Sequence, residues 1–226
     1  LLRQALARHH ITRLDALVVT HPDDDHMGSL ASLQGVVQVD RVLLARDGLA
    51  CSCESCGKLR REAESLVGKD RIAGLSQGDR LRLGDFEFTC VWPVAFKDEG
   101  GNGDSLCFTV DTDFDRDGSR EWRSLLVGDA EHEEVAEMLS AGLIEGVDVY
   151  KVGHHGSKNA LTQDQAAKLS PRVSLCSVGA GNRYGHPAAS TVEALERAGS
   201  AVVRTDEHGD VACRFAKNHI SVKTLR

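Results

Sequence analysis

Short apolar runs rich in Val, Leu and Ile alternate with amphipathic segments along this chain of 226 residues. Runs of strand length and stretches with helical spacing follow one another, which indicates a mixed α/β fold rather than an all-β fold. Strands are predicted at 14–20, 42–45, 80–83, 86–91, 106–110, 122–127, 147–152, 173–178, 201–204, 211–215 and 220–225. Helices are predicted up to residue 10, after Met27, and at 59–67, 131–139, 163–169 and 190–198.

Two local patterns add detail to this prediction. Ser190-Thr-Val-Glu193 has the form of a capping box, so we expect it to open the helix that ends before Gly199. The runs 201–204 and 211–215 flank His208-Gly209, and we expect them to pair as a hairpin.

Length and charge limit the classes of protein. A hydrophobic fraction of 41% is enough for a folded core, and we expect a single catalytic domain over 1–226. The net charge of −7 argues against a broad basic face for duplex DNA. It does not exclude phosphate substrates, because bound divalent cations reverse the local charge of a carboxylate-rich pocket.

The strand predicted to end at Thr20 runs into four potential metal ligands: His21, Asp23, Asp25 and His26. Clustered carboxylates repel one another unless a cation lies among them, although a solvated acidic turn is the alternative interpretation.

Two further predicted strands are followed by residues of types that bind metal ions. One ends in Gly128-Asp129, and the other in Gly153-His154-His155. Strand ends in α/β proteins are common places for binding sites. Together, the three segments predict a metal centre.

The order of these motifs resembles the metallo-β-lactamase superfamily, an αββα sandwich of two mixed β-sheets flanked by helices. Two more segments, Lys151-Val-Gly-His-His-Gly-Ser157-Lys158 and Gly179-x-x-Asn182-x-Tyr184-Gly-His186-Pro187, look like one branch of it. That branch is the C-terminal domain of the ComEC family, the channel proteins of bacterial DNA uptake. The strand pair that usually opens the family does not precede His21, so we expect a first sheet short of its N-terminal strands.

The resemblance implies one or two divalent metal ions and assigns ligands to them. Its ligand set is His21 and Asp23 on one ion, Asp25, His26 and His154 on the other, and Asp129 between them. Asp23 replaces the usual second histidine, and 102–105 occupies the place of another. Because carboxylate replaces imidazole, the preference moves from Zn²⁺ towards Mn²⁺.

The chemistry expected of such a centre is hydrolysis. A bound divalent ion lowers the pKa of its water to about 7 and so would supply hydroxide at neutral pH, with Asp25 orienting that water. His155 and His186 are the further catalytic candidates. The candidates for contact with a phosphate substrate are Ser157, Lys158, Asn182, Tyr184 and His186. An equally open interpretation makes His186-Pro187 a turn held by hydrogen bonds.

We therefore predict a phosphodiesterase or nuclease that cleaves single-stranded DNA during uptake. The resemblance also implies attachment to a membrane channel and a soluble domain on the extracytoplasmic side of the plasma membrane. Two alternatives stay open: hydrolysis of a small ester, lactone or phosphocholine-like substrate, and a catalytically idle domain that binds or gates DNA. The oligomeric state is not predicted.

Three other clusters have less specific patterns. Cys51-Ser-Cys53-Glu-Ser-Cys56 could bind zinc, form a disulfide or be a surface insertion. The segment from Asp113 to Gly118 imitates half of a calcium loop, but a solvated hairpin turn accounts for it better. The acidic run 131–134 is interpreted as a solvated helix face.

Overall fold

The computed structural model describes residues 2–225, and the chain divides into two compact units. The first unit contains the chain up to residue 77 together with 93–106. The second contains 78–92 and the chain from 107 onward. Each unit has its own sheets and its own hydrophobic core. The prediction of one domain over 1–226 stays a prediction.

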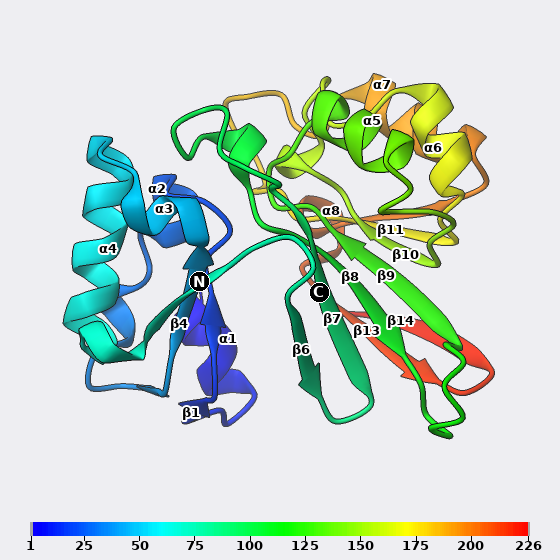
Figure 1. Ribbon diagram of the computed structural model, residues 1–226. Helices are drawn as coiled ribbons and strands as arrows, with labels where there is room; N and C mark the ends of the chain where they lie inside the picture. Colours follow the sequence, from blue (N-terminus) through cyan, green and yellow to red (C-terminus); the bar gives the residue numbers. More distant parts are fainter. Residues whose placement is uncertain (1, 226) are drawn as a thin grey trace. The chain divides into compact units, whose positions relative to one another are not determined.

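The first unit is built on a three-stranded parallel sheet with the order β2-β4-β5. A second parallel pair joins β1 and β3. Helix α4 covers the three-stranded sheet (Figure 1), and its buried residues Cys56, Leu59, Ala63 and Val67 follow the helical spacing of an apolar stripe. The elements are α1 (Leu2–Arg8), β1 (Arg13–Leu14), β2 (Leu17–Val18), α2 (Asp24–Met27), β3 (Gln38–Val39), β4 (Val42–Ala45), α3 (Arg46–Ala50), α4 (Glu54–Val67) and β5 (Ile72–Leu75).

The second unit is built on a seven-stranded mixed sheet with the order β12-β11-β10-β9-β8-β7-β6. Strands β9 to β12 are parallel, and β6 to β9 are antiparallel. A separate antiparallel pair joins β13 and β14. The strands are β6 (Arg80–Leu83), β7 (Phe86–Trp92), β8 (Cys107–Thr112), β9 (Trp122–Leu126), β10 (Val149–Lys151), β11 (Val173–Cys176), β12 (Ala201–Arg204), β13 (Asp210–Ala216) and β14 (His219–Leu225).

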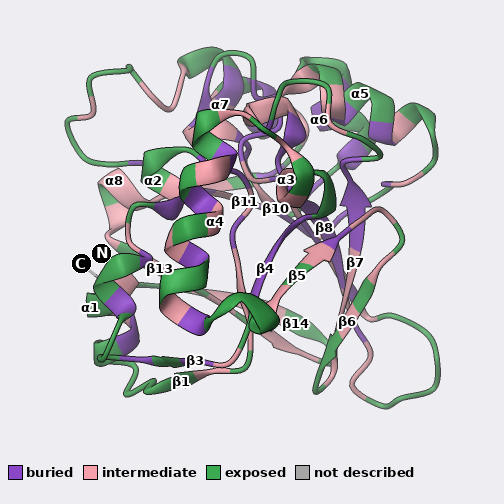
Figure 2. Ribbon diagram, turned by 60° about the vertical axis from the view of Figure 1, so that its left-hand side comes forward, coloured by how far each residue is buried: buried purple, intermediate pink, exposed green. Residues whose placement is uncertain are grey.

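Helices cover one face of the seven-stranded sheet, as Figure 1 shows for α5 (His132–Ser140), α6 (Gln163–Leu169) and α7 (Ala189–Arg197). Their apolar residues and those of the central strands form one buried cluster that includes Met138, Leu169 and Leu195. Figure 2 shows buried residues concentrated along strands such as β8 and β10. The short helix α8 (Thr205–His208) follows β12. The rigid strands therefore end at backbone positions fixed by a close-packed core.

Most predicted elements are present, and the mixed α/β class is confirmed. The predicted strand 14–20 is instead two short strands in different sheets. A short 3-10 helix at Ala31–Leu33 follows Met27 as expected, and the one-turn helix α2 precedes it. Helix α4 begins at Glu54, five residues before the predicted start, because Cys53 caps it.

Two predictions at the end of the chain are wrong. Strand β12 does not form a hairpin with 211–215 but pairs in parallel with β11, because α7 provides the crossover that parallel neighbours need. Residues 211–215 belong to β13, whose partner is β14. Ser190 does not cap α7 either, since the N-cap position is Ala188 and Ser190 lies within the first turn.

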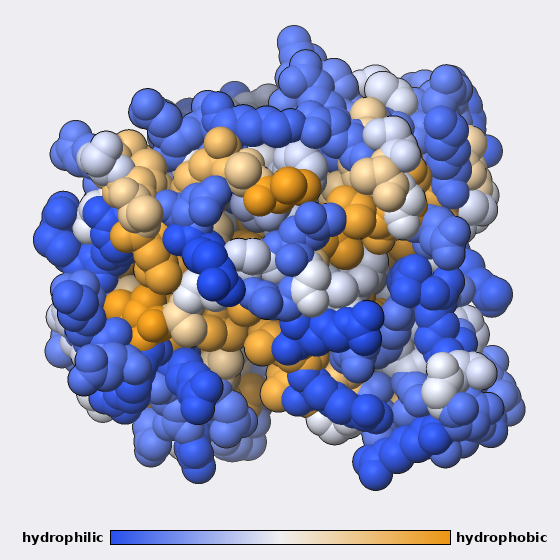
Figure 3. Space-filling model, in the orientation of Figure 1, coloured by the Kyte–Doolittle hydropathy of each residue, from blue (hydrophilic) through white to orange (hydrophobic). Residues whose placement is uncertain are grey.

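Hydrophilic side chains cover much of the face drawn in Figure 3, and hydrophobic side chains are visible among them. Among residues 2–225, each helix is too short or too polar to cross a membrane.

Candidate metal centre

In the first unit, the ligand motif begins after β2 and extends into α2. Asp23 is the N-cap of α2, so the motif turns from extended chain into one helical turn. The His21 side chain is buried, and its ring centroid lies 4.1 Å from that of His26. The turn thus brings together two imidazoles that are five residues apart in sequence.

Each imidazole faces a carboxylate of the same motif. His21 Nε2 lies 3.6 Å from an Asp23 oxygen, and His26 Nε2 lies 3.9 Å from an Asp25 oxygen. These separations are too long for hydrogen bonds. They are close to the roughly 3–3.5 Å between two ligand atoms that each lie about 2.1 Å from one ion. The donor set of the motif therefore fits a divalent cation.

Hydroxyl groups contact Nδ1, the second ring nitrogen, of both His21 and His26. Thr20 Oγ1 lies 3.1 Å from His21 Nδ1 and 3.2 Å from His26 Nδ1. Ser105 Oγ lies 3.2 Å from His21 Nδ1. A hydroxyl at Nδ1 fixes the ring orientation that presents Nε2 to a ligand. Sequence reasoning singled out 102–105 only for a missing histidine, because nothing local connects Ser105 with a residue 84 positions away.

In the second unit, Asp129 follows β9 and is 2% exposed. His155 Nε2 lies 3.5 Å from Asp129 Oδ2. His155 Nδ1 lies 2.8 Å from the Ser177 carbonyl oxygen, and because a carbonyl only accepts, Nδ1 is the donor of this hydrogen bond. In the neutral form of the ring, Nε2 then carries the lone pair that a metal needs.

His154 and His155 both have left-handed backbone conformations, with φ of 42° and 52°. A non-glycine residue in this region costs of order 1–2 kcal/mol, and such residues are concentrated at functional sites. The sequence-based prediction made His154 the ligand and His155 a catalytic group, and both roles stay predictions. The 3.5 Å contact with Asp129 described above is made by the ring of His155.

Glu131 contacts a predicted ligand, and sequence reasoning missed this contact. His154 Nδ1 lies 2.7 Å from Glu131 Oε1, and Ser157 Oγ donates to the same oxygen over 3.0 Å. The interpretation of 131–134 as a solvated face is wrong for Glu131, whose side chain is 25% exposed. As the N-cap of α5, Glu131 lies at the helix start rather than on its outer face, so its carboxylate can reach the 154–157 turn. Its position two residues after Asp129 was the available signal.

The predicted phosphate contacts differ in exposure. Lys158 and Tyr184 are exposed, the latter at 79%, whereas Ser157 is buried and its hydroxyl donates to Glu131. The Tyr184 ring stacks on His186 at an interplanar angle of 18°. Their roles in substrate binding stay predictions.

Asn182 ties the 182–186 turn together. Its amide nitrogen donates to the Gly179 and His186 carbonyls, and its amide oxygen accepts from the Tyr184 and His186 N–H groups. The interpretation of His186-Pro187 as a turn held by hydrogen bonds agrees with the two bonds between the His186 backbone and Asn182. The turn holds the His186 ring 5.7 Å from that of His154. Burial, followed by the nearby His154 and His155, lowers the pKa of His186.

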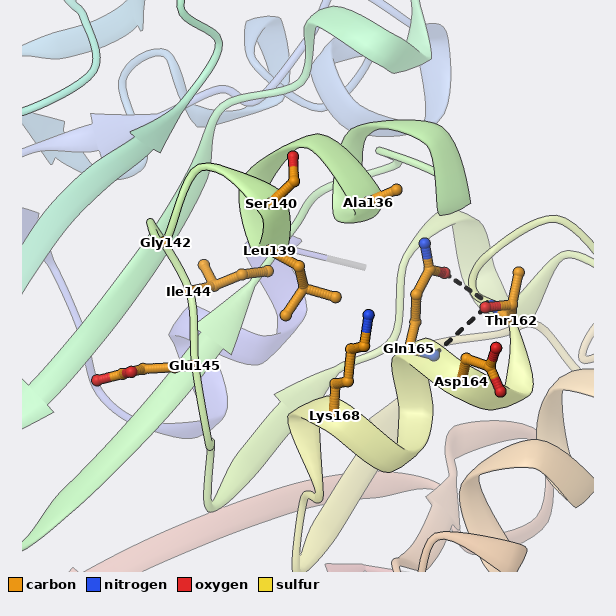
Figure 4. Close-up of a pocket in the computed structure, with 10 residues that line it drawn as sticks. All are labelled: Ala136, Leu139, Ser140, Gly142, Ile144, Glu145, Thr162, Asp164, Gln165 and Lys168. Carbon is orange, nitrogen blue, oxygen red and sulfur yellow. Dashed lines mark hydrogen bonds between the residues drawn. The ribbon is translucent and has the colours of Figure 1, made fainter.

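Other grouped features of the second unit lie apart from these ligands. Figure 4 shows a surface pocket where α5 faces α6, with Leu139, Ile144 and Lys168 among its lining residues. It contains none of the predicted site residues. Asp113, Asp115 and Glu121 form an acidic group at a turn, where Lys217 Nζ lies 2.5 Å from Asp115.

No family model matches the chain. It is 31% identical to the ComE operon protein 3 of Bacillus subtilis over 210 residues, which are 93% of this chain and 26% of that protein. It is 26% identical to the Recombination protein 2 of Haemophilus influenzae over 214 residues, or 94% of this chain and 24% of that protein. Competence protein ComA of Neisseria gonorrhoeae is 24% identical over 216 residues, which are 96% of this chain and 27% of that protein. The chain spans about a quarter of the length of these relatives.

CmlA is a solved structure that is similar at the level of the fold. CmlA of Streptomyces venezuelae, a diiron β-hydroxylase, aligns with a TM-score of 0.56 and 15% identity over 95% of this chain and 45% of that chain. YhfI of Bacillus subtilis, a metallo-β-lactamase fold protein, aligns with a TM-score of 0.44 and 12% identity over 84% of this chain and 74% of that chain.

The chain is similar, over most of its length, to one part of proteins such as the ComE operon protein 3 and competence protein ComA. The order of its metal-ligand motifs resembles that of the metallo-β-lactamase superfamily.

Proposed function

We propose that this chain is a metal-dependent hydrolase whose ligands are His21, Asp23, Asp25, His26, Asp129 and His154. One observation carries the proposal: each unit gathers its own imidazoles and carboxylates at the point where a strand ends. In the first unit the gathered rings are those of His21 and His26. In the second, Asp129 is buried beside His155, which makes His155 a further candidate ligand.

The donor set favours hard divalent cations. The first unit offers two carboxylates and two imidazoles, and Ser105 contacts the ring of His21. A set this rich in oxygen favours Mn²⁺ over Zn²⁺. One or two such ions, when bound, would supply Lewis-acid chemistry and neutralise the charge of a phosphate substrate.

The side chains of this chain supply orientation and proton transfer. Asp25 is 61% exposed, so it can accept a hydrogen bond from the attacking water and orient it. His186 has a lowered pKa that favours the neutral ring, because burial and two nearby histidines oppose its protonation. A neutral His186 can accept a proton from water or hold the departing oxygen through a donated hydrogen bond. Tyr184 and Lys158 are exposed enough to contact a phosphate.

The proposed substrate is the phosphodiester backbone of single-stranded DNA. The support is similarity to proteins named for competence, together with the His154 to Lys158 and Asn182 to His186 segments. We propose that the chain acts within a larger plasma-membrane protein that carries the DNA channel, on the extracytoplasmic side. Its acidic surface suits a nuclease that holds DNA through cations at the site rather than through a broad basic face.

The direct test is cleavage of a labelled single-stranded oligonucleotide with Mn²⁺, Zn²⁺ or Mg²⁺ added to chelator-treated protein. We expect Mn²⁺-dependent cleavage that Asp25→Ala and His26→Ala abolish. Asp24→Ala is the matched control, because Asp24 lies in the same helical turn but is 82% exposed and pairs with Lys58. Removing that surface ion pair costs at most about 1 kcal/mol.

Three outcomes would contradict the proposal or alter it. Equal loss of cleavage in Asp24→Ala and Asp25→Ala would mean that the turn, rather than a ligand, was lost. Cleavage of chromogenic carboxyl esters without cleavage of DNA would favour the small-ester alternative. Failure to bind any of the three ions in an elemental analysis would contradict the metal centre itself, and DNA binding without cleavage would then favour a gating role.

A further inference from the structure

Three cysteines that are not among the proposed ligands converge in the first unit. Cys51 follows α3, Cys53 is the N-cap of α4, and Cys56 lies in the first turn of that helix. Their sulfur atoms lie within 4.8 Å of one another, and none of the three forms a disulfide. Three thiols with soft sulfur ligands have thus been brought to a single point.

The carbonyl oxygen of Glu99 faces all three sulfurs. The distances from this oxygen are 3.0 Å to Cys53 Sγ, 3.7 Å to Cys56 Sγ and 3.8 Å to Cys51 Sγ. A carbonyl oxygen has two lone pairs, so it cannot accept three good hydrogen bonds at once. The arrangement is better explained if a cation, rather than three thiol protons, belongs at its centre.

These distances match a small coordination tetrahedron. Bonds of 2.3 Å to sulfur and about 2.0 Å to oxygen give edges of roughly 3.5 Å between sulfur and oxygen and roughly 3.8 Å between two sulfurs. The three observed distances of 3.0–3.8 Å lie on both sides of the first value. The limit of 4.8 Å between sulfurs allows the second. Each of the three distances to the oxygen therefore differs from the tetrahedral edge by at most about 0.5 Å.

The backbone is strained where it delivers this carbonyl. Glu99 has a φ of 48° and Gly100 a φ of 86°, so two successive residues adopt the left-handed conformation. A Cβ at Gly100 would lie 2.6 Å from Cys56 Sγ, which means that only glycine permits this close approach. Strain of this kind persists only where the surroundings enforce it.

Hydrogen-bond donors and positive charge lie around the three sulfurs. The Cys53 N–H lies 3.4 Å from Cys51 Sγ, and the Cys56 N–H lies 3.3 Å from Cys53 Sγ. Helix α4, with 14 residues, directs the positive end of its dipole at these sulfurs. Arg60 donates to the Cys51 carbonyl over 2.7 Å and adds a positive charge.

Access from solvent is open. A hollow of about 460 Å³ is lined by Cys51 and Cys53 together with Asp47 and Phe96. An ion can therefore reach the sulfurs without unfolding of the first unit.

We propose that Cys51, Cys53 and Cys56, with the carbonyl oxygen of Glu99 as fourth ligand, bind a zinc ion that fastens the 96–105 loop to the start of α4. Thiolate ligands select Zn²⁺ over the harder Mn²⁺ expected at the other ligands. The ion has a structural role, because all four coordination positions are filled from the chain.

The zinc site connects directly to the first ligand motif. Within the loop, the Asp104 carboxylate accepts hydrogen bonds from three backbone N–H groups of 97–100. The next residue, Ser105, contacts the buried ring of His21. Fixing Glu99 thus fixes the loop that holds Ser105 against His21. Loss of the zinc would loosen this contact without removing a ligand of the hydrolytic centre.

Cobalt substitution is the first test, and it needs no variant. The full chain, treated with chelator under reducing conditions, is titrated with Co²⁺. We expect the sulfur-to-cobalt charge-transfer band and the visible bands of tetrahedral cobalt, saturating at one equivalent and displaced by Zn²⁺. His21→Ala and Asp129→Asn should keep the charge-transfer band, which separates this site from the proposed hydrolytic centre.

Cysteine variants supply the second test. We expect Cys53→Ser and Cys56→Ser to lose one equivalent of zinc in an elemental analysis, whereas Cys213→Ser keeps it. Cys213 is the control thiol because it lies in β13, outside the first unit. Trypsin should also cut after the exposed Lys97 several-fold more slowly in zinc-loaded protein than in the chelated protein or Cys53→Ser. Cleavage after Lys217, in the turn between β13 and β14, is the internal reference.

The proposal is overturned if the charge-transfer band is absent, or if the three thiols react with a thiol reagent at the same rate with and without zinc. A disulfide among Cys51, Cys53 and Cys56 in protein purified under reducing conditions would also overturn it. If Cys53→Ser does not fold, the cobalt titration of the unmodified chain decides by itself.

Discussion

Glu131 allows a quantitative test of the second unit. Its Oε1 lies 2.7 Å from His154 Nδ1 and accepts the Ser157 hydroxyl over 3.0 Å. Glu131→Ala removes this acceptor and leaves both donors unsatisfied in a region where Ser157 is 4% exposed. The imidazole of His154 then loses the contact that sets its orientation.

Two magnitudes follow from this loss. Hydrogen bonds to a charged acceptor contribute about 1.5–3 kcal/mol, so we expect the free energy of unfolding to fall by about that amount. If His154 is a metal ligand, loss of its orienting carboxylate should weaken metal binding about 10- to 100-fold. Glu131→Gln should recover part of both effects, because the amide oxygen can still accept one of the two hydrogen bonds.

The assay pairs a Mn²⁺ titration by calorimetry with urea unfolding of the metal-free protein. Glu133→Ala is the matched control, since it removes the same charge from the same helical turn at an exposed position. The reasoning is refuted if Glu131→Ala and Glu133→Ala bind Mn²⁺ with equal affinity. A loss of stability alone, with unchanged affinity, would assign Glu131 a structural role and remove His154 from the ligand set.

Three further predictions concern other contacts. Gly156→Ala should destabilise the protein by about 1–3 kcal/mol more than Gly181→Ala in thermal unfolding. Both glycines have positive φ, but only a Cβ at Gly156 would clash, because it would lie 2.6 Å from a proline side chain. Equal losses of stability in the two variants would contradict the clash. Arg123→Lys should cost about 1.5–3 kcal/mol in urea unfolding, since lysine cannot reproduce the two 2.6 Å bonds of the guanidinium to Asp111; a change within error would show that the pair is not stabilising. Ser105→Ala should lower the affinity for the metal ion proposed at His21, whereas Ser105→Thr should retain it, because only threonine keeps the hydroxyl that contacts the ring; metal stoichiometry at limiting Mn²⁺ measures this, and equal affinities would refute a role of the hydroxyl.

Local sequence patterns were sufficient for much of the fold and for the types of ligand. The boundaries of β6 and α6 match their predictions residue for residue, because strand and helical periodicity lie within a few consecutive positions. The segment from His21 to His26 is likewise local, and one helical turn is enough to bring its two rings together. Ligand chemistry depends on residue type, which sequence alone supplies.

Contacts between distant positions were decided by the tertiary structure. Glu131 contacts a histidine 23 residues away, Ser105 a histidine 84 residues away, and the Glu99 carbonyl a group of cysteines 43–48 residues away. The pairing of β12 with β11 rather than with β13 is a choice of the same kind. Periodicity indicates which face of an element is buried, but it carries no information on which distant element covers that face. Only close packing of the folded chain selects those neighbours, and the groups that orient the ligands come from them.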